Sequence, residues 1–182
     1  MVAAVQTVDV GTGLLAGVRL VPSPHQDARP PGATLSLVVV HGISLPPGEF
    51  GGPFIDALFT GCLPAAAHPY FATVTGLRVS AHLCIARDGT VTQYVPFHRR
   101  AWHAGASSWR HRVACNDYSV GIELEGADEI AYTAAQYTQL AQVLAALRSA
   151  YPQLVDVAGH SDVAPGRKTD PGPAFDWQQV PR

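Results

Sequence analysis

The sequence predicts an α/β fold: a single domain with a central mixed β-sheet flanked by helices. Three observations support this prediction. The run LSLVVVH from Leu35 is almost continuously apolar and rich in valine, which is typical of a central strand buried on both faces. The pair Asp88-Gly89 between two strand-like runs indicates a β-hairpin. From Thr133 an apolar stripe predicts a long helix, with Gln136 at capping-box spacing.

The other elements follow in chain order. GVRLVPS predicts a first strand, and the Pro-rich PSPHQDARPPG behind it predicts a surface loop. We expect the strand from Leu35 to end at His41, because the next residues are rich in Gly and Pro, with a short helix at 53–59. YSVGIELEG predicts a further strand, LVDVAGH predicts one that ends at His160, and the tail from Pro171 is expected as surface coil.

Composition excludes several functional classes. The 182 residues are 47% hydrophobic and 14% charged with a net charge of -2, which argues against a disordered chain or a strongly basic nucleic-acid binder. The basic cluster at 98–112 is interpreted either as a solvated loop or as the rim of a site for an anionic substrate. Three scattered cysteines, no charged signal start and no long apolar run predict a cytoplasmic protein that spans no membrane. A monomer is the default expectation, since the sequence does not fix the oligomeric state.

Two predicted strands end in histidines, His41 and His160, and Asp170 follows in a loop that can fold back toward them. Two histidines and a carboxylate with an open fourth position form the ligand set of a hydrolytic zinc site. The spacing follows no fixed helical motif, so a capping or packing role for each histidine remains an alternative.

Further charged residues lie near these candidates. Glu123 and Glu125 share one face of their predicted strand by the period of two. They either face solvent on an edge strand, or one of them moves a proton from an attacking water to a leaving nitrogen. Lys168 is the only lysine of the chain. Its ammonium would stabilise the oxyanion formed from an amide carbonyl, although an exposed loop lysine is the alternative.

Several segments in order between about 17 and 177 resemble one family, the AmpD-type 1,6-anhydro-N-acetylmuramyl-L-alanine amidases of the amidase type 2 and peptidoglycan-recognition-protein superfamily: VVVHGISLPPGEFGGPFI, RVSAHLCIARDGTVTQYVPFHRRAWHAGASSW, CNDYSVGIELEG, AYTAAQY and GHSDVAPGRKTDPGPAFDW. The resemblance implies an amidase type 2 fold over one domain, 1–182. It also implies one zinc ion with three protein ligands, His41, His160 and Asp170.

The same resemblance assigns further roles. It selects Glu123 over Glu125 as the catalytic carboxylate and makes Lys168 the residue that stabilises the oxyanion. The implied substrate-binding residues are Arg78, Ala101 and Trp102.

The implied activity is a cytoplasmic, zinc-dependent N-acetylmuramoyl-L-alanine amidase of peptidoglycan recycling. It would hydrolyse the amide between the lactyl group of 1,6-anhydro-N-acetylmuramic acid and L-alanine. In bacteria with an inducible β-lactamase, such an enzyme keeps the inducing muropeptide low. Two alternatives are a muropeptide-binding module that does not cut and a periplasmic amidase. The complete ligand set argues against the first and the absent signal peptide against the second.

The chain departs from the family pattern at two positions. Gly42 stands where Asn is common, and Ala114 stands where Arg is common, so directional hydrogen bonds to substrate are lost there. We hypothesise that Arg112 replaces the missing arginine. Of the other histidines, His82 is expected to be packed within the fold, whereas His103 is a candidate for lining the substrate groove.

Overall fold

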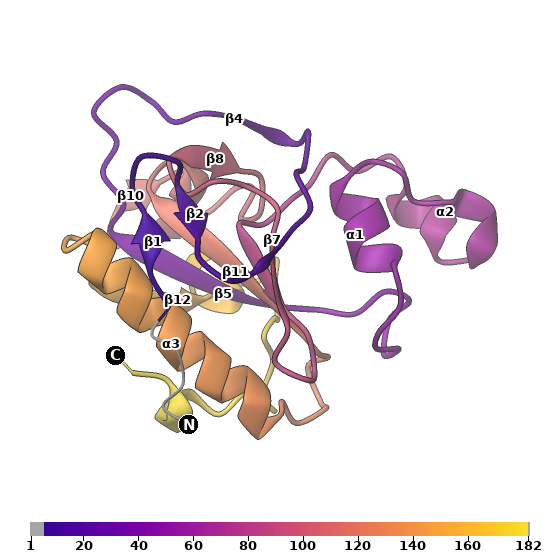
Figure 1. Ribbon diagram of the computed structural model, residues 1–182. Helices are drawn as coiled ribbons and strands as arrows, with labels where there is room; N and C mark the ends of the chain where they lie inside the picture. Colours follow the sequence, from indigo (N-terminus) through magenta and orange to yellow (C-terminus); the bar gives the residue numbers. More distant parts are fainter. Residues whose placement is uncertain (1–5, 182) are drawn as a thin grey trace.

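A six-stranded sheet forms the centre of the computed structural model, which describes residues 6–181 (Figure 1). The strand order is β12-β5-β11-β6-β7-β3, with bounds Asp156–Gly159, Leu37–Ile43, Ser119–Glu125, Leu83–Ile85, Val91–Gln93 and Arg19–Leu20. Strands β12, β5, β11 and β6 are parallel to one another, whereas β7 is antiparallel to β6 and parallel to β3. This mixed sheet confirms the predicted fold class.

Short ribbons and helices surround the sheet. The ribbons are β1–β2 (Val8–Asp9, Leu14–Leu15), β4–β8 (Gln26–Ala28, Arg99–Ala101) and β9–β10 (Ser108–Trp109, Arg112–Val113). The helices are α1 (Phe54–Phe59), α2 (Phe71–Val74), α3 (Ala134–Ala150) and α4 (His160–Val163), with 3₁₀ turns η1 (Ala65–Ala67), η2 (Cys115–Asp117) and η3 (Trp177–Gln179). Within residues 6–181, no helix combines the length and apolar character needed to cross a bilayer.

The two faces of the sheet are covered by different elements. Alternate residues of β5 and β11, such as Val38 and Ile122, pack with α3 in the largest apolar cluster. In Figure 1, α3 lies along one side of the sheet, and α1 and α2 lie together, apart from α3. Phe59 of α1 and Phe71 of α2 belong to an apolar cluster that includes Cys84 of β6. Leu37 and Val39 point to the opposite face, where they pack with Val163 of α4. The face opposite α3 is therefore the one on which residue 41 of β5 lies.

Helix α3 begins as predicted, with Thr133 as its N-cap. The Thr133 hydroxyl accepts the Gln136 N–H at 3.2 Å, and the Gln136 side chain accepts the Thr133 N–H at 3.0 Å. The buried Gln136 amide also donates to the carbonyls of Ile85 and Glu125, at 3.1 and 2.9 Å. One capping residue thus ties the start of α3 to β6 and β11.

Two strand ends differ from the prediction. Strand β5 continues past His41 to Ile43, because its parallel partner β11 pairs with it as far as Glu125. Strand β12 ends at Gly159, and His160 begins α4, where the Asp162 carboxylate accepts the Gly159 N–H at 2.8 Å. Pairing with a neighbouring strand, which local composition does not encode, decides the first boundary, and the start of α4 decides the second.

Two segments expected on the surface contribute to the core. The Pro-rich segment contains strand β4, which pairs with β8, and its Ser23 and His25 are buried. The tail is largely irregular, but Phe175 is buried against Tyr132 and Tyr137. In both segments the buried side chains contact residues that are distant in the sequence, as Ser23 does with Phe59 O and Phe175 with Tyr132.

Candidate metal and catalytic site

Parallel pairing of β5 and β11 places His41 directly beside Glu123. Both side chains lie on the sheet face opposite α3, since they alternate with residues that pack against that helix. Every residue of β11 is buried, so the interpretation of Glu123 and Glu125 as solvated edge residues is wrong. Glu123 is 8% exposed and Glu125 5% exposed.

The three predicted metal ligands converge on one point. The Nδ1 atoms of His41 and His160 are 2.9 Å apart, and Asp170 Oδ2 lies 3.3 Å from the first and 3.0 Å from the second. One ligand atom from each of the three residues lies within 4.8 Å of the others. The cluster joins a strand, a helix start and a loop.

These residues fit a zinc ion by donor type and spacing. Bonds of about 2.0–2.2 Å in a tetrahedral arrangement separate neighbouring ligand atoms by about 3.3 Å, close to the spacing observed. A cation between them would offset the repulsion of two imidazole lone pairs and a carboxylate oxygen that face one another. His41 and His160 are 1% and 3% exposed, so water does not satisfy these groups.

The loop after α4 carries the third ligand back to the histidines. The Asp170 carbonyl accepts the Ser161 N–H at 2.9 Å, and Ala164 O accepts the Lys168 N–H at 3.1 Å. The Tyr132 hydroxyl donates to Pro171 O at 3.0 Å, which holds the chain directly behind Asp170. The loop thus folds back as the sequence predicts.

Electrostatics keep these ligands in the forms that bind metal. Burial lowers the pKa of His41 to about 4, so its imidazole is neutral at pH 7. Burial alone would raise the pKa of Asp170, but the adjacent imidazoles of His160 and His41 outweigh it, and the pKa lies well below the ordinary value. A neutral histidine and an ionised carboxylate are the required ligand states.

Glu123 differs from every other carboxylate of the site. Its Oε2 atom is buried and has no hydrogen-bond partner within residues 6–181. Burial raises the pKa of Glu123 well above its ordinary value, the charge of Asp170 adds to this, and the charge of Lys168 opposes it. An unpaired oxygen beside a ligand histidine, with a pKa moved toward neutrality, is suited to accept and return a proton.

A cavity of about 560 Å³ contains these groups together: His41, His160, Asp170, Glu123 and Lys168 all line it. Lys168 is exposed at its wall, and its positive charge lowers the pKa of both Glu123 and His41. Trp102 lines the same cavity, and the Arg78 guanidinium lies 5.4 Å from the centre of its ring. Ala101 is fully buried in β8, where it pairs with Gln26, and it does not line this cavity, so the structure does not bring it to the site.

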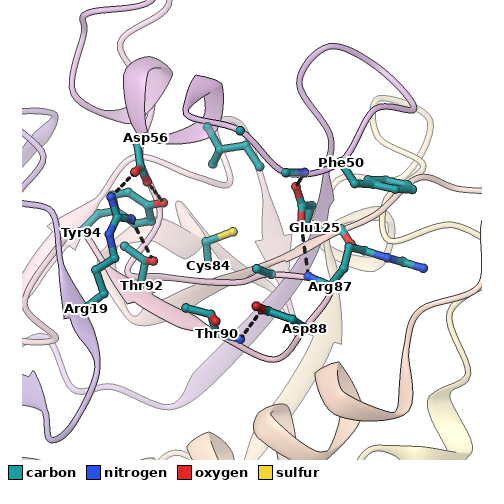
Figure 2. Close-up of a pocket in the computed structure, with 14 residues that line it drawn as sticks. Arg19, Phe50, Asp56, Cys84, Arg87, Asp88, Thr90, Thr92, Tyr94 and Glu125 are labelled. Carbon is teal, nitrogen blue, oxygen red and sulfur yellow. Dashed lines mark hydrogen bonds and ion pairs between the residues drawn. The ribbon is translucent and has the colours of Figure 1, made fainter.

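Glu125 faces a second cavity of about 480 Å³, shown in Figure 2. Its carboxylate accepts the Gly51 N–H and, at 3.2 Å, the Arg87 N–H. It therefore joins the loop after β5 to the β6–β7 hairpin. The structure separates the two glutamates that strand periodicity leaves equivalent, because Glu125 is bound to main-chain groups whereas Glu123 Oε2 is not.

Gly42 and Ala114, the two positions that depart from the family pattern, have different surroundings in the structure. A Cβ atom at Gly42 would lie 2.3 Å from the Tyr132 hydroxyl, which occupies the space above the glycine. Ala114 has φ 57° and starts the η2 turn. Arg112 stacks on the Tyr118 ring at 3.6 Å and reaches Ser36, before the start of β5 and at the other end of that strand from His41. Arg112 does not line the cavity in this structure, and the hypothesis that it replaces the missing arginine in substrate binding stays a prediction.

Other residues of the site carry little sequence signal. His82 is buried and accepts the Gly121 N–H at 3.0 Å, which confirms the packed role expected for it. His103 lines the cavity, but its imidazole also contacts His41 at 2.9 Å. Arg167 lines the cavity and donates to the carbonyls of Ala104 and Ala106. In the sequence, the signal for these contacts is the alternation of side chains along β11, which places Gly121 on the same face of the sheet as Glu123.

Acid is expected to destabilise the metal-free protein between pH 6.5 and about 4. Burial lowers the pKa of His41 to about 4 and holds those of His82 and His103 well below 6.5. The unfolded chain therefore binds more protons in this range, and the free energy of unfolding falls as pH falls. For His41 alone the change from 6.5 to about 4 amounts to roughly 3 kcal/mol.

Glu123, whose pKa is raised, acts in the opposite direction but is one group against three histidines. Urea unfolding of the chelator-treated protein at pH 7.5 and pH 4.5 measures the net effect. An unfolding free energy that is constant or higher at pH 4.5 would contradict the expectation.

The fold and the site together define a class: an α/β protein with a His-His-Asp cluster and a buried glutamate on one face of a mixed sheet. The family model for N-acetylmuramoyl-L-alanine amidase matches residues 31–173. The 1,6-anhydro-N-acetylmuramyl-L-alanine amidase AmpD of Escherichia coli (strain K12) is 63% identical over 166 residues, 91% of this chain and 91% of the relative.

Solved structures agree with this match. A crystal structure of a selenomethionine AmpD derivative has a TM-score of 0.92 at 61% identity and covers 94% of this chain and 96% of that chain. The Escherichia coli amidase AmiD, solved with anhydro-N-acetylmuramic acid-L-Ala-D-gamma-Glu-L-Lys, has a TM-score of 0.58 at 27% identity, over 83% of this chain and 58% of that one. The chain therefore belongs to the amidase type 2 family, and within it to the AmpD-type amidases.

Proposed function

We propose that the chain is a zinc-dependent amidase that hydrolyses the bond between the lactyl group of 1,6-anhydro-N-acetylmuramic acid and L-alanine. One observation carries the proposal: three convergent ligand atoms, an unpaired glutamate oxygen and a lysine share one cavity. AmpD relatives over most of the chain, and the AmiD complex with an anhydromuropeptide, support the substrate class.

The chain's own residues supply the groups that amide hydrolysis needs. His41, His160 and Asp170 would hold zinc, which when bound acidifies water and polarises a carbonyl. Glu123 Oε2 would accept the proton of the attacking water and pass it to the departing L-alanine nitrogen. Lys168 would place its charge where the carbonyl oxygen becomes negative.

Residues of the cavity wall support a proposed orientation of the substrate. Trp102 offers an aromatic face, and Arg78 lies over it with an exposed guanidinium that suits a carboxylate of the stem peptide. In this proposal the stem peptide extends toward Arg78. The scissile amide then lies between Glu123 and Lys168.

We further propose one amidase domain over 1–182, acting as a monomer in the cytoplasm during peptidoglycan recycling, with no nucleic-acid or membrane partner. One six-stranded sheet forms the centre of the described residues, which supports the single domain. In a bacterium with an inducible β-lactamase, this activity would lower the inducing muropeptide.

The test is to incubate purified protein with anhydromuramyl tripeptide, with chelator, without chelator, and after zinc is restored. Peptide release that chelator stops and zinc restores is expected. No release in any arm would overturn the proposal. Binding without release would identify a muropeptide-binding module in its place.

Replacement of Lys168 by alanine is expected to lower kcat by roughly 10²–10³-fold, because one fixed donor to the oxyanion is lost. Zinc content is expected to be unchanged, since Lys168 is no ligand of the cluster. Single-turnover kinetics and metal analysis measure the two effects. Turnover equal to that of the native chain would show that Lys168 is a surface residue without a role in catalysis.

A further inference from the structure

Both candidate ligand histidines have their second ring nitrogen held by the same dipeptide. His41 Nε2 lies 2.9 Å from His103 Nδ1, and His160 Nε2 lies 3.3 Å from Ala104 O. Each histidine turns Nδ1 toward the cluster and Nε2 toward residues 103–104. One short segment between β8 and β9 therefore faces both rings.

The partners determine where each proton lies. Ala104 O only accepts, so His160 Nε2 carries a proton and Nδ1 is free for metal. His41 binding metal through Nδ1 must likewise carry its proton on Nε2 and donate it to His103 Nδ1. His103 Nε2–H then donates to the Ser119 hydroxyl at 3.2 Å. In this arrangement every ring nitrogen of the three histidines donates a hydrogen bond, accepts one or is free to bind metal.

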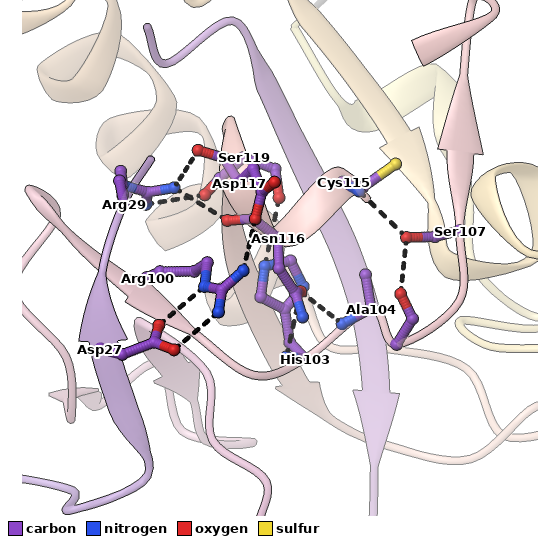
Figure 3. Close-up of polar contacts among 11 residues, drawn as sticks. Asp27, Arg29, Arg100, His103, Ala104, Ser107, Cys115, Asn116, Asp117 and Ser119 are labelled. Carbon is purple, nitrogen blue, oxygen red and sulfur yellow. Dashed lines mark hydrogen bonds and ion pairs between the residues drawn. The ribbon is translucent and has the colours of Figure 1, made fainter. Parts of the chain in front are cut away.

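A separate set of contacts holds the segment in place. Asn116 Oδ1 accepts the N–H groups of His103 and Ala104, at 3.3 and 2.8 Å, as Figure 3 shows. Arg29 in turn donates to Asn116 O at 2.9 Å, and Arg167 donates to Ala104 O. The segment is fixed from its main chain, independently of any metal.

Gly121 explains how the imidazole of His103 reaches this position. Glycine in the interior of a central strand lowers stability, and it commonly marks a close approach by another group. A Cβ atom at Gly121 would lie 2.4 Å from His103 Cγ, so the ring rests on the strand at the one residue without a side chain. The strand sequence and the loop sequence thus fit each other beside His41.

We propose that His103 is a positioning residue for the metal site: with Ala104 O and the Asn116 amide, it fixes the tautomer and orientation of both ligand histidines. This inference rests on the proposed function in that His41 and His160 bind zinc. Loss of such an outer partner typically costs about 10–100-fold in metal affinity.

Zinc affinity, measured by competition with a chromophoric chelator, tests the proposal in three variants. His103→Phe removes the acceptor and is expected to weaken zinc binding by about 10–100-fold. His103→Asn carries an amide oxygen near the place of Nδ1 and is expected to recover most of that loss. His111→Asn, the same change at an exposed histidine outside the cavity, is the control with native affinity.

The outcomes separate the two proposals. A native chain that does not bind zinc would overturn the proposed function. A native chain that binds zinc, with His103→Phe folded and binding it equally well, would overturn only the role of His103.

A second measurement does not depend on a variant that folds. Long-range ¹H–¹⁵N spectra of the zinc-loaded native protein distinguish histidine tautomers. We expect His103 with its proton on Nε2 and His41 with its proton on Nε2. A proton on His103 Nδ1 would overturn the inference whatever the variants show.

Discussion

Replacement of Glu123 by glutamine is expected to lower kcat by about 10²–10⁴-fold, the usual contribution of a positioned acid–base group. Glutamine keeps the size of the side chain but cannot take up the proton that the attacking water must lose. Zinc affinity is expected to change little, because Glu123 is outside the ligand cluster although it is paired with His41 across two strands. Steady-state turnover of an anhydromuropeptide, together with zinc content, measures both expectations.

Glu125 offers a matched control, since Glu125→Gln makes the same change two residues along the same strand face. Its carboxylate accepts main-chain N–H groups of Gly51 and Arg87, and an amide replaces one acceptor oxygen by a donor. We expect lower stability with turnover per folded molecule largely retained. Equal losses of kcat in the two variants would remove the special role of Glu123.

Replacement of Asp170 by alanine is expected to abolish both zinc binding and amide hydrolysis. If three ligands share a binding free energy on the order of 12 kcal/mol, losing one weakens zinc by roughly three orders of magnitude. The carboxylate is also the negative charge that faces His41 and His160, so its removal leaves two neutral imidazoles in contact.

Chelator competition and turnover with excess zinc measure this second expectation. Asp176→Asn is a suitable control, because Asp176 is an exposed carboxylate that caps η3 and is no ligand of the cluster. Native zinc affinity in Asp170→Ala would show that this aspartate is not a ligand. Zinc binding at native strength with no activity would assign it to another step of the reaction.

Much of the fold can be predicted from local patterns. The β6–β7 hairpin follows from Asp88-Gly89, where Gly89 has φ 89°, and α3 follows from its stripe and its Thr133 cap. Boundaries at the site were less predictable. Strand β5 runs two residues beyond His41 because β11 supplies its hydrogen bonds, and no residue near position 41 reports that partner.

The candidate site, like the fold, was predictable in part from the sequence. The residue types His, His, Asp, Glu and Lys, and their order in the chain, are properties of the sequence. The resemblance to the AmpD-type amidases assigned roles to these residues, and it selected Glu123 over Glu125 as the catalytic carboxylate. The structure gives a physical basis for that choice, since main-chain groups of two loops bind Glu125, whereas Glu123 Oε2 has no partner in the described part of the chain.

The sequence by itself determined the chemical groups of this protein, the elements that carry them and the family to which the chain belongs. Only the tertiary structure decided that His41 Nδ1, His160 Nδ1 and Asp170 Oδ2 meet, and that His103 lies on Gly121 behind them. The reason is physical: those contacts join residues up to 129 positions apart, through strand register and loop closure. Local propensity has no information about such pairs.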